Sequence, residues 1–150
     1  MVTTWKRPES VLVVVATQGG EVLLLERRAP GGFWQSVTGS LKWGESAATA
    51  AARELREETG LDAVPEDCGE TQRFPIVPPW RFRYAPDATH NLEHVFRLIL
   101  PARVEVRSNP SEHAAVCWLP RALAARRVGS WSNREAILRW VSDLRSWNGA

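Results

Sequence analysis

Cysteine, lysine, tyrosine and methionine are all scarce in this sequence. Of its 150 residues, two are Cys, two are Lys, one is Tyr and one is Met. The two cysteines, Cys68 and Cys117, lie far apart, and we expect no secretory leader before them. We therefore interpret them as reduced thiols with a structural role, and we expect neither a disulfide nor a metal-binding pair.

Long hydrophobic runs are also lacking. The longest, Val11–Ala16 and Val22–Leu25, have the length of strands and are too short to cross a bilayer. The N-terminal segment Met1–Pro8 is polar and contains no apolar stretch of the kind found in signal peptides. We therefore expect a cytoplasmic protein that has no membrane partner.

A large excess of charge of either sign is absent, since 19 basic and 17 acidic side chains leave a formal net charge of +2. This balance, without a basic tail, argues against a nucleic-acid partner. The apolar fraction of 44% and the charged fraction of 24% are ordinary for a globular protein. The length then predicts one domain over residues 1–150.

Arginine and tryptophan, by contrast, are abundant. The chain has 17 Arg against two Lys, and it has eight Trp. These side chains suit planar, anionic ligands, because a guanidinium forks onto phosphate oxygens and an indole stacks on flat rings. A drift in nucleotide composition would also replace Lys with Arg, so the excess alone assigns no ligand.

Strand and helix patterns alternate along the chain. The apolar run Val11–Val15 is typical of a strand covered on both faces, and Val22–Leu25 follows it after a glycine turn. Further strands are expected over residues 33–37, 95–100 and 115–119, and the stretch 65–86 is expected to be loop and edge strand. This interleaving predicts a layered α/β domain.

Two longer helices are predicted. The first covers Ser46–Thr59, with Ser46 as the N-cap and Gly60 as the residue that follows its C-terminal end. The second begins at Ser132, which would form a capping box with Glu135.

The first of these helices carries an unusual acidic face. Glu54, Glu57 and Glu58 stand at i, i+3 and i+4, so they share one side of the helix and repel one another. They also lie near its C-terminal end, where the helix dipole disfavours negative charge. A hard divalent cation such as Mg²⁺ would offset this cost. The alternative is a solvated surface face that Arg53 and Arg56 neutralise.

Nine positions around these glutamates fit one pattern. Counted from Gly39, the pattern reads G-x5-E, then seven residues, then R-E-U-x-E-E-x-G-U, where U is aliphatic. The residues that fill it are Gly39, Glu45, Arg53, Glu54, Leu55, Glu57, Glu58, Gly60 and Leu61. An accidental match is on the order of 10⁻⁶ or rarer. The segment resembles the signature of the Nudix hydrolases, and this resemblance implies an α/β/α sandwich around a mixed sheet.

The resemblance also implies a chemistry. Nudix enzymes hydrolyse a diphosphate linkage attached to another moiety, and they use Mg²⁺ or sometimes Mn²⁺. Carried onto this chain, the implied metal ligands are Glu54, Glu57, Glu58 and the carbonyl oxygen of Gly39. Arg53 is then expected in the catalytic centre, where it and Glu45 orient these carboxylates.

A base must accept the proton of the attacking water, and two carboxylates are candidates. Glu57 lies within the signature, and Glu112 lies just before the strand predicted over residues 115–119. Glu112 is also our candidate for a further metal ligand from a distant loop, with an ordinary exposed loop acid as the alternative. The choice of base between Glu57 and Glu112 stays open.

Four segments outside the signature resemble one branch of the family, the bacterial dihydroneopterin triphosphate pyrophosphatases of folate synthesis. They are Lys6–Pro8, Phe33–Ser40, Arg83–Pro86 and Trp131–Arg134. The resemblance implies a small-molecule substrate with a planar pterin and a triphosphate. It also implies hydrolysis to dihydroneopterin monophosphate and pyrophosphate.

Several residues are expected to contact such a substrate. Lys6 and Arg27 are expected at phosphate oxygens, and Thr38 is expected to donate a hydroxyl hydrogen bond. Ser130 precedes a predicted helix, whose free N–H groups favour anions. The segment expected to border the pterin comprises Phe74, Pro75, Ile76 and Val77, with Trp34, Arg81 and Arg83 as further candidates.

Two other functions remain alternatives. One is hydrolysis of modified nucleoside triphosphates or dinucleoside polyphosphates by a Nudix enzyme. The other is a Nudix-fold module that senses a nucleotide without turnover, but the complete set of glutamates argues against it. The sequence sets no expectation for the oligomeric state.

Overall fold

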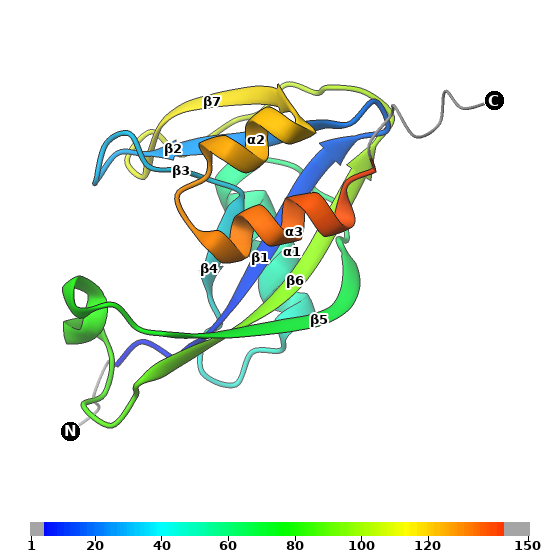
Figure 1. Ribbon diagram of the computed structural model, residues 1–150. Helices are drawn as coiled ribbons and strands as arrows, with labels where there is room; N and C mark the ends of the chain where they lie inside the picture. The colour runs from blue at the N-terminus through cyan, green and yellow to red at the C-terminus, as the bar shows by residue number, and fades with distance from the viewer. Residues whose placement is uncertain (1–4, 143–150) are drawn as a thin grey trace.

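The computed structural model describes residues 5–142 and is shown in Figure 1. Its elements are β1 (Glu9–Thr17), β2 (Glu21–Arg27), β3 (Trp34–Gln35), β4 (Val37–Ser40), α1 (Ala47–Thr59), β5 (Glu66–Pro75), the 3₁₀ helix η1 (Pro78–Arg83), β6 (His90–Leu100), β7 (His113–Pro120), α2 (Arg121–Arg127) and α3 (Trp131–Trp140). Among these residues, no helix combines the length and the apolar character needed to span a bilayer.

Within the described part of the chain, seven strands form one mixed sheet. The main strand order is β3-β2-β1-β6-β5, while β4 pairs with β1 and β7 pairs with β2. Strands β1 and β6 run parallel over nine register pairs, from Glu9↔Leu92 to Thr17↔Leu100, and the other strand pairs are antiparallel. The expected edge strand is β5, which pairs with β6 alone.

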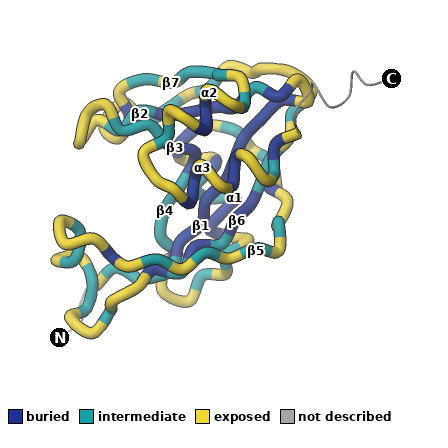
Figure 2. Tube along the Cα trace, viewed as in Figure 1, coloured by how far each residue is buried: buried dark blue, intermediate teal, exposed yellow. Residues whose placement is uncertain are grey.

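The central strand β1 is buried on both faces, as its continuous apolar sequence predicts. Val11, Val13 and Val15 pack in one core with α1, whereas Leu12 and Val14 pack in a second core with α2 and α3. Figure 2 shows these buried strands in dark blue between more exposed outer layers. The prediction of an α/β/α sandwich around a mixed sheet is therefore confirmed.

Helix α1 follows the sequence prediction closely. The Ser46 hydroxyl accepts a hydrogen bond from the Thr49 N–H at 3.2 Å, so Ser46 is the N-cap. Gly60 ends the helix with a φ of 77°, a left-handed conformation that glycine adopts without strain. Ala50 and Ala51 are fully buried against the sheet. Their small size holds the helix, and with it the acidic face, close to the strands.

The predicted start of the last helix is wrong by two residues. Helix α3 is capped by Ser130, whose hydroxyl accepts a hydrogen bond from the Asn133 N–H at 3.2 Å. Ser132 lies inside the helix and is buried, so it does not form the expected capping box. Glu135 is more than half exposed and pairs with Arg134.

Candidate functional site

A large cavity lies where the sheet divides into two branches. The first half of β1 pairs with β4, whereas β2 joins β1 at Ala16↔Val22, so the two partners leave β1 in different places. In Figure 1, the branch of β2, β3 and β7 separates from the branch of β5 and β6. The cavity has a volume of about 1010 Å³ and is lined by residues of both branches.

Most of the predicted site residues line this cavity. They are Lys6, Arg27, Thr38, Gly39, Glu54, Glu58, Phe74, Pro75, Ile76, Val77, Glu112 and Ser130. Among the residues predicted to bind metal or to act in catalysis, Arg53 and Glu57 do not line it. Segments that lie more than 100 positions apart in the sequence are thus brought together around one space.

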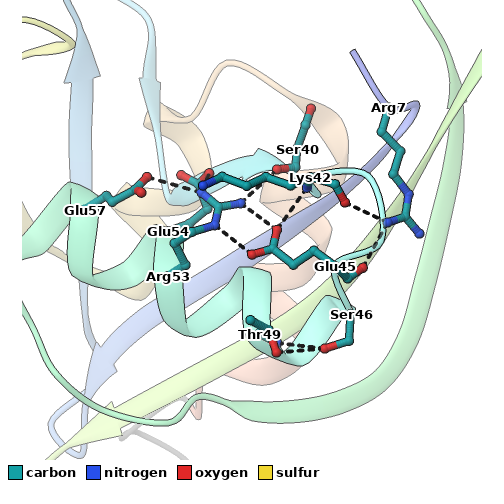
Figure 3. A network of polar contacts seen from close by, with 9 residues as sticks. All are labelled: Arg7, Ser40, Lys42, Glu45, Ser46, Thr49, Arg53, Glu54 and Glu57. Carbon is teal, nitrogen blue, oxygen red and sulfur yellow. Dashed lines mark hydrogen bonds and ion pairs between the residues drawn. The ribbon is translucent and has the colours of Figure 1, made fainter. Parts of the chain in front are cut away.

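Arg53 holds the signature loop and helix α1 together through a network of polar contacts (Figure 3). Its guanidinium donates two hydrogen bonds to the Glu45 carboxylate, both at 2.8 Å. It also donates to Glu54 at 2.8 Å, to Glu57 at 3.3 Å and to the carbonyl of Ser40 at 3.2 Å. One side chain therefore fixes the carbonyl at the end of β4 and three signature carboxylates, in keeping with an orienting role.

The pairing of Arg53 with Glu45 is the most shielded part of this network. Their side chains are only 14% and 10% exposed. The Arg53 guanidinium lowers the pKa of Glu45 to about 2, and a hydrogen bond from the Lys42 N–H lowers it further against the opposing effect of burial. Glu45 is thus ionised and acts as a fixed anchor.

Glu54 lies against the backbone of β4 at Gly39. A Cβ atom placed on Gly39 would stand 2.2 to 2.5 Å from the carboxylate atoms of Glu54. The φ of Gly39 is not in the left-handed region, so the backbone conformation alone does not require glycine. Glycine is required because any side chain at this position would block the close approach of the Glu54 carboxylate. This contact explains why the signature pairs a glycine on a strand with a glutamate on a helix.

Glu58 is the most buried acid of the site, with 2% of its surface exposed. Its Oε1 has no hydrogen-bond partner among residues 5–142, and the Nε2 of His113 stands 3.6 Å away. Burial raises the pKa of Glu58 well above its usual range, and the neighbouring Glu54 carboxylate raises it further. Burial also lowers the pKa of His113, so this imidazole is not a strong counter-charge.

The oxygen atoms of these carboxylates are chemically suited to bind a divalent cation. Among the described residues, no three acidic, His or Cys side chains gather closely enough to hold a metal ion, because Glu57 turns toward Arg53 and Glu112 lies on an exposed loop. The unpartnered oxygen of Glu58 and the adjacent Glu54 nevertheless form an all-oxygen donor pair, which hard cations prefer. A cation would also offset the effects of burial and of the neighbouring Glu54 carboxylate, which together raise the pKa of Glu58.

Cationic and aromatic side chains form another part of the cavity wall. Lys6 lies over the ring of Tyr84 at 5.7 Å, and Arg27 and Arg83 lie over the ring of Trp80 at 5.1 and 5.6 Å. Burial, with the positive charges of Arg83 and Arg27, lowers the pKa of Lys6. Three cations held this close together suit a polyanionic ligand.

Some predicted contacts take a different form in the structure. The Thr38 hydroxyl donates to the carbonyl of Val11 at 2.9 Å, so its proton is already used within the sheet and only its lone pairs face a ligand. The Ser130 hydroxyl caps α3. Of the further candidates, Arg83 lines the cavity, whereas Arg81 and Trp34 do not.

Several cavity residues were missed by the sequence analysis. His113 follows the predicted Glu112. Trp80 lies in η1 and Tyr84 follows it, so they stand on either side of Arg81 and Arg83. Proximity to predicted residues was the available signal for these three. Asn91 and Glu93 on β6 gave no signal, because polar residues alternating along a strand usually face solvent.

The fold and this signature site define a class: the chain belongs to the Nudix family. The NUDIX domain matches residues 6–141, which cover nearly the whole chain. Proteins of this family typically depend on a divalent metal.

Among curated proteins, the chain is similar to the dihydroneopterin triphosphate diphosphatase of Escherichia coli (strain K12), with 46% identity over 91% of this chain and 94% of the relative. The protein of the same name from Haemophilus influenzae is 39% identical over 94% of this chain and 92% of its own length. A solved structure of the E. coli dihydroneopterin triphosphate pyrophosphohydrolase superposes with a TM-score of 0.86 at 43% identity, covering 93% of this chain and 98% of that chain.

Proposed function

We propose that this protein hydrolyses dihydroneopterin triphosphate to dihydroneopterin monophosphate and pyrophosphate in folate biosynthesis. The observation that carries this proposal is the 46% identity, over 91% of the chain, to a protein named for that activity. The cavity supports it, because buried carboxylates, clustered cations and aromatic rings lie around one space.

Glu54 and Glu58 are the residues best placed to hold Mg²⁺, and Mn²⁺ would suit the same oxygens. A bound Mg²⁺ supplies charge neutralisation at phosphate oxygens and lowers the pKa of a bound water. Arg53 fixes Glu54 through the 2.8 Å hydrogen bond, and Gly39 leaves the space that the carboxylate occupies. The protein thus holds its acidic ligands in place before the substrate arrives.

Lys6, Arg27 and Arg83 are placed to bind the triphosphate oxygens. Cleavage between the α and β phosphates adds the oxygen of one water to a phosphorus atom and releases pyrophosphate, so the proton of that water must be accepted nearby. Glu112 lines the cavity, whereas Glu57 does not line it and is engaged by Arg53. We therefore favour Glu112 over Glu57 as the proton acceptor.

A substrate panel tests the proposed function. Purified protein with Mg²⁺ should release pyrophosphate from dihydroneopterin triphosphate with a kcat/KM at least tenfold above that for any nucleoside triphosphate. Glu58→Gln should remain folded but lose turnover, because a neutral amide is a poor Mg²⁺ ligand. A tenfold preference for a nucleotide would overturn the folate assignment, and near-normal activity of Glu58→Gln would overturn the metal role.

A further inference from the structure

Two buried polar side chains of β6 face the same cavity. Asn91 and Glu93 are 6% and 5% exposed, and both line it. They lie two positions apart on one strand, so they point to the same face of the sheet as Val95, which packs in the core beneath α3. Neither residue belongs to the signature or to the cationic wall.

Each of these side chains has an acceptor oxygen without a partner in the described part of the chain. These atoms are the Oε1 of Glu93 and the Oδ1 of Asn91. The amide nitrogen of Asn91 donates to the Ser10 hydroxyl at 2.7 Å, which leaves the carbonyl oxygen as its free group. Leaving a buried acceptor unpaired is costly, so two of them beside an open cavity point to a ligand that carries donors.

Donors that lie side by side on one edge of a ligand suit the carboxylate of Glu93. A 2-amino-4-oxo-pyrimidine ring, as in a pterin, presents a ring N–H beside an exocyclic NH₂. Guanine presents the same edge, whereas adenine has an NH₂ group beside a ring acceptor. A carboxylate pairs well with two parallel N–H groups, as it does with a guanidinium.

Aromatic side chains flank this position. Phe74 is paired with Asn91 across β5 and β6, and its ring meets that of Trp131 edge to face, with centroids 6.4 Å apart. Both rings line the cavity, so a flat heterocycle would find apolar contact next to the polar pair.

The polar pair and the metal candidates reach the cavity from opposite faces of the sheet. Glu54 and Glu58 come from α1, which packs on one core, whereas Glu93 shares the face covered by α3. The cavity thus has one end suited to phosphates and another suited to a ring.

We propose that Glu93, together with Asn91, determines substrate specificity by accepting hydrogen bonds from the two-donor edge of a 2-amino-4-oxo heterocycle. The proposal rests on the proposed function for the phosphate end of the cavity. Burial raises the pKa of Glu93 to about 7, and the nearby Ser132 hydroxyl partly offsets the rise. Two N–H donors from a ligand would favour the ionised carboxylate of Glu93, which pairs best with such donors.

The test compares three substrates in wild type and in Glu93→Gln. This variant keeps the size of the side chain but replaces an acceptor with a donor. We expect kcat/KM for dihydroneopterin triphosphate and for dGTP to fall on the order of 100-fold, mainly through KM, because the donor edge loses its partner. The value for dATP should stay within about threefold. Glu105→Gln, at an exposed position outside the cavity, is the matched control and should change none of the three.

The outcomes separate this inference from the proposed function. If wild type prefers a nucleotide, the folate assignment fails. The ratio of kcat/KM for dGTP to kcat/KM for dATP would still report on the role of Glu93. An equal loss with all three substrates, or no loss with any, would overturn the role of Glu93. Thermal denaturation checks that the variant is folded. If Glu93→Gln is not folded, Glu93→Asp takes its place, because it keeps the charge but moves the carboxylate oxygens away from the ligand. Glu93→Asp should lower the ratio of kcat/KM for dGTP to that for dATP. An unchanged ratio would overturn the role of Glu93.

Discussion

At the scale of single residues, the contact between Gly39 and Glu54 is the sharpest constraint in the site. A methyl group at residue 39 would overlap the Glu54 carboxylate, but the backbone at this position is not in the left-handed region. The carboxylate is the flexible end of its side chain, so it would move and the fold would stay.

Gly39→Ala should therefore separate activity from stability. We expect kcat/KM to fall on the order of 100-fold, since a displacement of about 1 Å in a catalytic group has effects of this size. The free energy of unfolding, measured in urea, should change by less than about 1 kcal/mol.

Gly31→Ala is the control for this prediction, because residue 31 has open space around it and an ordinary φ. It should leave both activity and stability unchanged. Full activity of Gly39→Ala would show that the position of Glu54 is not critical for turnover.

Single residues of the site also differ in how well the sequence predicts their positions. The spacing of Glu54 and Glu58 predicts that they share one face of the helix, because the helical period determines which side chains lie together, and both line the cavity. Glu57 lies at the edge of that face and turns to Arg53 instead. Glu93 was missed because its burial depends on α3 and on the parallel pairing with β1, which no local pattern encodes.

At the scale of elements, Arg53 joins α1 to the loop that precedes it. No acidic residue lies in the first turn of α1 to interact with its free N–H groups. The Ser46 cap and the pairing of Arg53 with Glu45 instead connect the helix to this loop. The resemblance implies an orienting role for both residues, and the structure adds the hydrogen bond from Arg53 to the carbonyl of Ser40.

Arg53→Ala should destabilise the protein by about 3 kcal/mol, because it leaves the nearly buried Glu45 carboxylate without its partner. Turnover should fall at least tenfold, since Glu54 loses the same guanidinium. Arg134→Ala removes an exposed pair with an N–O distance of 3.8 Å and should cost less than about 0.5 kcal/mol. Equal effects of the two substitutions on stability would contradict the anchoring role.

The pairing also has a pH signature. The pKa of Glu45 is lowered from 4.5 to about 2, so its stabilising contribution is complete above pH 4.5 and is lost as the pH falls toward 2. In Arg53→Ala, the free energy of unfolding should therefore change less as the pH falls from 4.5 toward 2. Urea unfolding of both proteins between pH 2 and pH 5 measures the difference.

At the scale of the whole molecule, the layers and the cavity depend on a few contacts between distant segments. The apolar runs predict the central strand, and alternation of strands and helices predicts the layered class. The division of the sheet was not predictable, because it depends on β1 pairing with β4 in one half and meeting β2 in the other. That division creates the cavity, so the site is a product of topology as much as of the signature.

Asn133 links α3 to Ser36, which lies between β3 and β4 just before the signature. Its Oδ1 accepts from the Ser36 N–H at 2.8 Å, and its amide nitrogen donates to the Ser36 hydroxyl at 2.9 Å, with both residues fully buried. The two resemblance segments 33–40 and 131–134 thus meet in one contact. This contact holds the α3 side of the cavity to β3 and β4.

Asn133→Ala should lower the free energy of unfolding by about 2 to 4 kcal/mol, because it removes two hydrogen bonds and leaves a buried N–H unpaired. Asn109→Ala, which removes an amide that serves an exposed loop turn, should cost less than about 1 kcal/mol. Urea denaturation of the two variants gives the comparison. Since the cavity is formed between the layers, Asn133→Ala should also weaken binding of dihydroneopterin itself, which carries no phosphate. Loss of stability with unchanged binding would mean that the ring end of the cavity keeps its shape without this link.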